Sequence, residues 1–239
     1  MIIDNGELRI NKENNKLIYL SYILNKNSPT YGNRNRFKIE KKSSIEMGDI
    51  ANSSSIETTT HIGTHIDMPY HFFKNGQTIE DFPANFWRFF SNEILFIELE
   101  NIKELVIGDS LIKELEKIEN RLNYKLLLVK TWACYIREKK EFWEKNFGFA
   151  PEIADYLRDN FPNIKIFGFD SISVSSFQNR LVGREAHRAF LNPKNPILLL
   201  EDMDLRKVNR ETIFKNITIA PLRIEKCDGL PCTVFGEIN

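Results

Sequence analysis

Residues 151–170 read Pro151-Glu-Ile-Ala-Asp-Tyr-Leu-Arg-Asp-Asn-Phe161-Pro-Asn-Ile164-Lys-Ile-Phe-Gly-Phe-Asp170. Pro151 favours a helix that begins here and runs through Phe161, because the missing N–H of a proline costs nothing in a first turn. The residues from Ile164 to Asp170 are mostly apolar, aromatic or β-branched, which is typical of a buried strand. This stretch therefore predicts a helix followed by a strand.

Apolar runs on both sides extend the pattern. Residues 125–130, Lys-Leu-Leu-Leu-Val-Lys, predict a strand before the helix, and Pro196-Ile-Leu-Leu-Leu200 predicts a later strand that is buried on both faces. A strand, a helix and a strand of these lengths suit a right-handed parallel βαβ unit. Asp170 and Glu201 would then stand at the carboxyl ends of two strands. The fold class predicted from these segments is α/β.

The remaining segments are expected to add further strands and helices to one domain. Leu111, Ile112, Leu115 and Ile118 recur at helical spacing, and residues 184–191 also have the character of a helix. No internal repeat, low-complexity tract or Pro/Gly/Ser linker divides the chain, so a single domain over 1–239 is predicted. The further strands are expected at 17–24, 36–40, 55–60, 93–99, 213–219 and 231–235.

Composition argues against several classes of partner. The chain has 33 Lys and Arg residues against 33 Asp and Glu, so it has no net positive charge to attract nucleic acid or anionic lipid. Cys134, Cys227 and Cys232 form no CxxC pair, which fits a reducing compartment. Because no secretion signal or apolar run of membrane-spanning length is seen, we expect a cytoplasmic protein. Its expected partner is a small-molecule substrate, and neither nucleic acid nor a membrane is expected.

Three of the four histidines fall within His61-Ile-Gly-Thr-His65-Ile-Asp67-Met-Pro-Tyr-His71. Neutral imidazoles and a carboxylate are ligands that a borderline divalent cation prefers, so this segment predicts a metal site. On a straight strand His61 and His65 would lie about 13 Å apart, too far to share one ion. We therefore expect a bend at Gly63 that turns both imidazoles and Asp67 toward a common point.

A metal site of this kind favours hydrolysis. A bound cation lowers the pKa of water to roughly 7 and polarises a carbonyl, and a nearby imidazole can move the proton. His71 is the candidate for proton transfer, and Glu201 could add an oxygen ligand, although Asp202 or Asp204 could do so instead. His187 could be a second-metal ligand, a proton shuttle or an outer-shell donor.

Structural roles compete with each of these assignments. The histidines could satisfy hydrogen bonds in the core, His71 could pack against Phe72 and Phe73, and Asp170 could cap the following turn. The aromatic cluster is expected to be core or subunit interface rather than a pocket wall. Its members are Phe82, Phe86, Trp87, Phe89 and Phe90.

The segment HIGTHIDMPYHFFKNGQTIEDFP, residues 61–83, resembles the HxGTHxDxPxHF signature of the putative cyclase family, which includes bacterial kynurenine formamidases and isatin hydrolases. The likeness continues at residues 169–173, 186–188, 199–201, 220–222 and 229–231. Thr30-Tyr31-Gly32 and Thr131-Trp132 depart from the Tyr-Pro-Gly or Trp-Pro-Gly and Thr-Gly-Trp elements of the family, in two regions expected to shape the substrate pocket.

The resemblance implies a function and a site. Zn²⁺ or Mn²⁺, as one or two ions, would be held by His61, His65 and Asp67 with His187 and Glu201, and His71 would transfer protons. It also implies an α/β fold with a mixed, barrel-like β core and surrounding helices, assembled as a homodimer or larger homo-oligomer.

The implied reaction is hydrolysis of a C–N amide bond in a small aromatic substrate, such as N-formylkynurenine to kynurenine and formate in tryptophan catabolism. Three alternatives stay open. The chain could hydrolyse isatin or a lactone, it could act as a biosynthetic cyclase or dehydratase, or it could be a non-catalytic, metal-stabilised binding protein.

Overall fold

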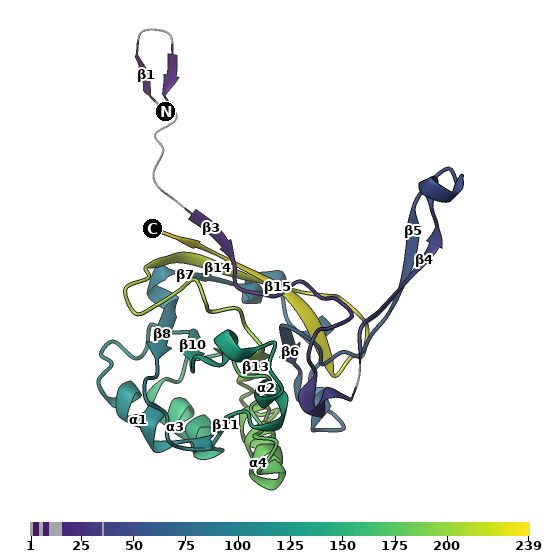
Figure 1. Ribbon diagram of the computed structural model, residues 1–239. Helices are drawn as coiled ribbons and strands as arrows, with labels where there is room; N and C mark the ends of the chain where they lie inside the picture. The colour runs from purple at the N-terminus through teal and green to yellow at the C-terminus, as the bar shows by residue number, and fades with distance from the viewer. Residues whose placement is uncertain (1, 5–6, 10–15, 35) are drawn as a thin grey trace.

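The computed structural model describes residues 2–4, 7–9, 16–34 and 36–239 (Figure 1). Within these ranges, nine strands form one mixed sheet, and their bounds are β3 (Lys16–Tyr19), β6 (His65–Asp67), β7 (Arg88–Phe90), β8 (Ile94–Glu98), β10 (Leu126–Lys130), β12 (Ile166–Phe169), β13 (Leu198–Glu201), β14 (Phe214–Pro221) and β15 (Gly229–Ile238). The order in space is β7-β14-β15-β6-β13-β12-β10-β8, and β3 also pairs with β15.

The parallel half of the sheet consists of β8, β10, β12 and β13. Its strands are the continuous apolar runs of the sequence, and Leu126, Phe167 and Leu199 are each completely buried. Strands covered on both faces need apolar side chains on both, which explains why these runs do not alternate with polar residues. The strands predicted at 125–130, 164–170 and 196–200 are confirmed.

Four helices accompany the described sheet: α1 (Asp109–Glu116), α2 (Glu141–Glu144), α3 (Glu152–Asn160) and α4 (Arg180–Phe190). Figure 1 shows α1, α3 and α4 grouped beside the parallel strands. Pro151 directly precedes α3, which lies between the parallel pair β10 and β12, so the predicted βαβ unit is confirmed. No helix in the described ranges has the length and apolar character needed to cross a membrane.

The two edges of the sheet meet along the chain. Strand β7 ends at Phe90 and β8 begins at Ile94, separated only by residues 91–93, yet β7 and β8 stand at opposite ends of the strand order. Consecutive residues therefore bring both edges together, and the sheet is nearly closed. The predicted α/β fold with a mixed, barrel-like core is confirmed.

Several predicted strands differ from the structure in extent or place. The strand expected at 17–24 ends at Tyr19, and those expected near 36–40 and 55–60 form a separate hairpin of β4 (Lys38–Ser43) and β5 (Ser53–Glu57). This hairpin projects from the body of the molecule and leaves apolar side chains such as Ile39 and Ile56 exposed (Figure 1). Strand propensity marked these segments, but it does not say which strand pairs with which.

The smaller elements complete the description. Strand β1 (Ile2–Asp4) pairs with β2 (Glu7–Arg9), and β9 (Val106–Ile107) pairs with β11 (Gly148–Phe149). Short 3-10 helices are η1 (Tyr31–Asn33), η2 (Ile45–Met47), η3 (Pro69–His71), η4 (Ile79–Asp81), η5 (Ala84–Trp87), η6 (Ser91–Glu93) and η7 (Ala133–Ile136).

The aromatic cluster of residues 82–90 belongs mainly to the core. Phe89 and Trp87 are buried, and the Phe86 ring lies 4.9 Å from that of Trp87. Phe90 is exposed, and Phe82 and Phe86 are partly buried against the core. The expectation was core or subunit interface rather than pocket wall. It is confirmed as core for the other four, none of the five lines the cavity described below, and an interface role for Phe90 stays a prediction.

Candidate metal centre

Strand β6 places two polar side chains on one face of the sheet. Because successive strand residues point to opposite faces, His65 and Asp67 share a face while Ile66 enters the core. In the antiparallel register between β6 and β13, Glu201 lies directly opposite His65. The sheet thus brings an imidazole and two carboxylates together, and all three are at least 95% buried.

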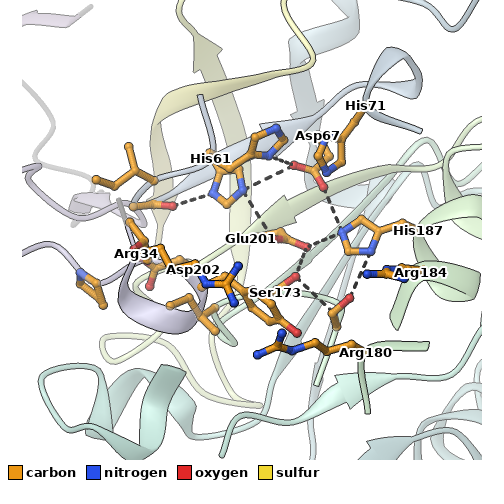
Figure 2. A pocket seen from close by; sticks show the side chains of 18 of the residues that line it. Arg34, His61, Asp67, His71, Ser173, Arg180, Arg184, His187, Glu201 and Asp202 are labelled. Atoms are coloured by element: carbon orange, nitrogen blue, oxygen red, sulfur yellow. Dashed lines mark hydrogen bonds and ion pairs between the residues drawn. The ribbon is translucent and has the colours of Figure 1, made fainter. Parts of the chain in front are cut away.

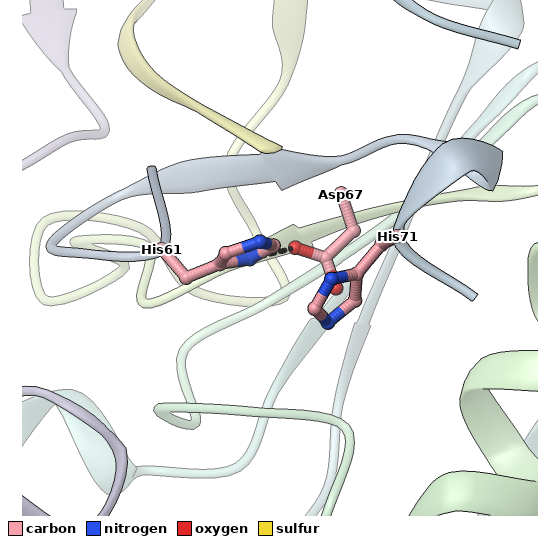
Figure 3. A group of neighbouring side chains, drawn as sticks. All are labelled: His61, Asp67 and His71. Atoms are coloured by element: carbon pink, nitrogen blue, oxygen red, sulfur yellow. Dashed lines mark hydrogen bonds and ion pairs between the residues drawn. The ribbon is translucent and has the colours of Figure 1, made fainter. Parts of the chain in front are cut away.

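The bend expected before this strand is present. Gly63 has φ of 59°, a left-handed conformation that glycine adopts without steric cost. The rings of His61 and His65 lie 5.3 Å apart between centroids, well below the 13 Å or so of a straight strand. Figure 3 shows His61 and His71 on either side of Asp67.

Helix α4 supplies His187 from its buried face. Its Nε2 lies 3.4 Å from Asp67 Oδ2 and 3.9 Å from Glu201 Oε1. All six residues predicted for the site, including His71 from η3, line one cavity of about 370 Å³ (Figure 2). Segments far apart in sequence therefore converge there, while the role of each residue as ligand or catalyst stays a prediction.

Backbone carbonyls fix the orientation of two imidazoles. His65 Nδ1 lies 2.8 Å from the carbonyl oxygen of Gly63, and His187 Nδ1 lies 2.7 Å from that of Gly183. A carbonyl can only accept, so each Nδ1 carries the proton and, in the neutral ring, each Nε2 presents a lone pair. Both lone pairs face carboxylates. A ring N–H that donates to a carbonyl while the other nitrogen stays free is the arrangement found in metal-ligating histidines.

Buried polar atoms without partners support a cation at this point. Among the described residues, His65 Nε2 and Asp67 Oδ2 are buried and have no hydrogen-bond partner. His65 Nε2 lies 3.4 Å from both Asp67 Oδ1 and Glu201 Oε2. Ligand atoms about 2.1 Å from a tetrahedral ion lie about 3.4 Å from one another, so the donor set fits a divalent metal.

A second possible ligand set shares Asp67. One ligand atom each from His61, Asp67 and His71 lies within 4.8 Å of the others, and the same holds for His65, Asp67 and Glu201. Nitrogen and carboxylate donors of this kind suit Zn²⁺ or Mn²⁺. Asp67 belongs to both sets, so the residues are compatible with either one or two metals.

The charges of the site are strongly coupled. Burial raises the pKa of Glu201 well above its usual value, and the nearby Asp67 carboxylate raises it further. Burial also acts to raise the pKa of Asp67, but the positive charge of His61 and its hydrogen bond to Asp67 Oδ1 hold the pKa well below its usual range. Burial lowers the pKa of His61, yet the carboxylates of Asp67 and Asp228 outweigh this and raise it to about 10. His61 thus holds a positive charge between two carboxylates, and ligation through Nδ1 would require loss of that proton.

Asp228 is a member of the site that the sequence analysis missed. It precedes β15 and lies 2.9 Å from His61 Nε2 and 3.3 Å from His71 Nδ1, and it accepts a hydrogen bond from Thr60 Oγ1. Hydrogen bonds from His61 and His71 hold the pKa of Asp228 well below its usual range. The available signal was its position just before Gly229-Leu230-Pro231, a segment of the family resemblance.

The other acidic candidates have different partners. Both carboxylate oxygens of Asp202 bind Arg137, at 2.8 and 2.7 Å, and Asp204 binds Arg206. Asp170 is completely buried and accepts hydrogen bonds from the backbone and hydroxyl of Thr131, both at 2.7 Å. Asp170 therefore anchors the loop after β10, and Glu201 is the acid of its cluster that faces the histidines.

The two regions that depart from the family pattern have different positions. Tyr31 lines the cavity together with Phe72 and Ile172, so this region does shape the pocket. Trp132 is not among the lining residues; it is 45% exposed and stacks on Tyr135 at 5.5 Å. The expectation that the Trp132 region shapes the pocket is wrong, because the bonds to Asp170 hold the Thr131 loop elsewhere.

The fold and the histidine–carboxylate cluster define an α/β protein with a candidate metal centre. A sequence model of the putative cyclase family matches residues 18–176, and the chain belongs to this family.

Curated relatives include two kinds of protein. A kynurenine formamidase of Bacillus cereus is 26% identical over 214 residues, covering 90% of this chain and 93% of that protein. A cyclase-like protein 3 of Oryza sativa subsp. japonica is 28% identical over 197 residues, covering 79% of this chain. The chain spans only 66% of the length of this rice protein.

Solved structures share the fold. Isatin hydrolase A from Labrenzia aggregata superposes with a TM-score of 0.76 at 18% identity, covering 94% of each chain. A potential metal-dependent hydrolase with cyclase activity gives a TM-score of 0.70 at 20% identity, covering 94% of this chain and 98% of that one. At these identities the likeness is one of fold.

Proposed function

We propose that this chain is a metal-dependent hydrolase of a C–N amide bond in a small aromatic substrate, and that N-formylkynurenine, cleaved to kynurenine and formate, is its substrate. The observation that carries the proposal is that two buried imidazole lone pairs and two carboxylates meet at one cavity. Two of these buried atoms, His65 Nε2 and Asp67 Oδ2, have no hydrogen-bond partner among the described residues. The kynurenine formamidases that match over 90% of the chain support the choice of substrate.

His61, His65 and Asp67 would hold a Zn²⁺ or Mn²⁺ ion, with His187 and Glu201 completing the site or binding a second ion. Such a cation lowers the pKa of a coordinated water to roughly 7 and polarises a carbonyl group. The backbone carbonyls of Gly63 and Gly183 accept from the Nδ1 atoms of His65 and His187, so that in the neutral rings the Nε2 atoms present the lone pairs that would bind the ion.

His71 is the proposed proton-transfer residue. Asp228 accepts from its Nδ1, which leaves Nε2 to take a proton from the attacking water as the new C–O bond forms. The same proton then passes to the amine nitrogen as the C–N bond breaks, which releases formate and the aryl amine. The apolar side chains of Phe72 and Ile172 line the cavity beside this site and can contact a planar ring.

Metal analysis and a formamidase assay together test the proposal. Protein purified without chelator should contain stoichiometric divalent metal by inductively coupled plasma analysis, and it should hydrolyse N-formylkynurenine. The variant His71→Ala should lower kcat by about 10² to 10⁴ while keeping its metal and melting temperature.

Tyr70→Ala is the matched control, since Tyr70 is the exposed neighbour of His71 and does not line the cavity. Metal-free protein, or full activity in His71→Ala, would contradict the proposal. Hydrolysis of isatin or a lactone in place of N-formylkynurenine would select the ring-opening alternative, and metal binding without any activity would select the binding protein.

A further inference from the structure

Three arginines line the same cavity as the metal-ligand candidates. Arg180 and Arg184 come from α4, and Arg34 follows η1 (Figure 2). Arg180 and Arg184 are four residues apart, and His187 is three residues beyond Arg184, so all three lie on neighbouring parts of one helix surface. At 1.5 Å per residue, the two arginines precede His187 by about 10.5 and 4.5 Å along the helix axis.

These guanidinium groups have no acidic partner among the side chains that the structure describes. No carboxylate of residues 16–34 or 36–239 lies within 4.0 Å of Arg34, Arg180 or Arg184. Elsewhere in the chain Arg137 and Arg206, for example, each bind an aspartate at 2.7 Å. Arg180 instead stacks on the Phe177 ring, with its Cζ 4.0 Å from the ring centroid.

The placement of these charges is electrostatically unfavourable for the free protein. Helix α4 begins at Arg180, its first turn contains no acidic residue, and the Asn179 side chain makes no capping hydrogen bond. Positive side chains near a helix N-terminus oppose the helix dipole, and like charges four residues apart repel. An anion in the cavity would offset both effects.

We propose that the site is specific for substrates that carry a carboxylate in addition to the scissile amide, and that Arg180 and Arg184, with Arg34, bind this carboxylate. The proposal rests on the proposed hydrolase function, because the amide carbonyl must reach the cluster around His187. Guanidinium groups bind carboxylates through paired N–H donors, and three that lack a carboxylate partner add a positive field that attracts anions. Neutral ring substrates such as isatin would supply no anionic partner for any of the three charges.

Paired substrates and paired variants test the specificity. Initial rates are measured for N-formyl-L-kynurenine, for its methyl ester and for formanilide, in the metal-loaded wild type and in Arg180→Gln, Arg184→Gln, Arg34→Gln and the double variant Arg180→Gln/Arg184→Gln. Arg88→Gln is the matched control, because Arg88 is an exposed arginine on β7 that does not line the cavity and its loss changes the net charge equally.

The wild type should prefer the free carboxylate over the ester. Arg180→Gln and Arg184→Gln should each lower kcat/KM for N-formyl-L-kynurenine roughly tenfold, through KM, and leave the rates with the ester and formanilide within about twofold. The KM for the acid should rise with salt in the wild type and depend less on salt in the double variant. Equal losses for charged and neutral substrates, or no loss, would overturn the inference.

Binding of L-kynurenine by calorimetry separates the two proposals. If the wild type hydrolyses none of the amides, yet binds L-kynurenine with an affinity that the double variant loses and Arg88→Gln keeps, the hydrolase proposal fails and the anion site stands. Hydrolysis of the amides without any selective effect of the arginine variants would leave the hydrolase and remove the anion site.

Discussion

Replacing Asp228 by asparagine tests whether one carboxylate determines the orientation and the tautomer of both His61 and His71. Oδ1 of Asp228 accepts from the Thr60 hydroxyl at 2.9 Å, and Oδ2 faces His61 Nε2 at 2.9 Å and His71 Nδ1 at 3.3 Å. An asparagine that keeps the bond to Thr60 directs its NH₂ group at both histidines. The ring N–H groups of His61 and His71 would then both face the N–H donors of the asparagine amide. To accept from this amide, His61 must present a lone pair at Nε2 and His71 one at Nδ1.

The consequence for metal binding follows from this change of tautomer. A His61 ring that accepts at Nε2 carries its proton on Nδ1, the atom 2.8 Å from Asp67 Oδ1 and on the side of the ligand cluster. Loss of such an outer-shell carboxylate typically lowers metal affinity or activity by 10- to 100-fold, or about 1.4 to 2.7 kcal/mol. Because the Asp228 side chain is 40% exposed, water can replace part of the lost hydrogen bonding and the fold should tolerate the change.

Competition with a chromophoric chelator measures the metal affinity of Asp228→Asn, and the formamidase assay at saturating metal measures the remaining effect on kcat. We expect 10- to 100-fold weaker metal binding and a lower kcat even when the site is full, since His71 is also misoriented. Asp155→Asn is the control, because Asp155 is 78% exposed on α3. Wild-type affinity together with wild-type kcat in Asp228→Asn would refute the reasoning.

Three further outcomes are expected. Gly229→Ala should weaken metal binding, measured by the same competition, because a Cβ at this position would lie 2.5 Å from His61 Cε1 and displace the ring; unchanged affinity would contradict this. A metal that binds only the folded chain should add about 2.7 kcal/mol to the free energy of unfolding when its free concentration is 100 times its Kd. Thermal melts should show this as a higher melting temperature, which EDTA lowers again and which Glu201→Gln makes smaller. Identical melts with and without EDTA would argue against a metal centre. Asp170→Ala should lower the free energy of unfolding in urea by at least about 1–3 kcal/mol, because the buried Thr131 donors lose their acceptor, and a smaller loss would mean that water replaces it.

The parallel half of the fold could be predicted because its signals are local. The runs at 125–130, 164–170 and 196–200 are apolar on both faces, and Pro151 marks the start of the helix between the first two. Each of these features depends on residues within about ten positions of one another. The strands and the crossover helix were therefore visible without knowledge of the rest of the chain.

Pairing between distant segments could not be predicted in the same way. Strand β6 has only the residues His65–Asp67, and it is a strand because β13 and β15 flank it. The hairpin of β4 and β5 has the composition of sheet strands, but its partners are each other and not the main sheet. Register and partner choice depend on contacts across the whole chain, which composition does not specify.

The candidate site also has features that could be predicted from nearby residues and features that could not. The bend at Gly63 was predictable from spacing, because two histidines four residues apart can share an ion only if the strand turns. Asp228 could not be found by spacing, since it lies 167 positions from His61 and reaches it through the loop before β15. His187 stood in an arginine-rich segment, and its burial became evident only from the face that α4 turns inward, which includes Gly183, Ala186 and Phe190.

The carbonyl groups of two glycines orient two of the imidazole rings, one on a bent segment and one on a helix. On the bent segment before β6, the carbonyl of Gly63 holds His65 Nδ1 two residues later, and on α4 the carbonyl of Gly183 holds His187 Nδ1 one turn later. Gly183 is also the point where the helix meets Ser175, because a Cβ there would lie 2.0 Å from the serine hydroxyl. Local backbone geometry thus decides which nitrogen of each ring is free, whereas the sheet register and the packing of α4 decide that both free nitrogens face Asp67 and Glu201. The orientation of the candidate ligands therefore depends both on contacts within a few residues of each histidine and on contacts between distant segments, and only the former can be predicted from the sequence.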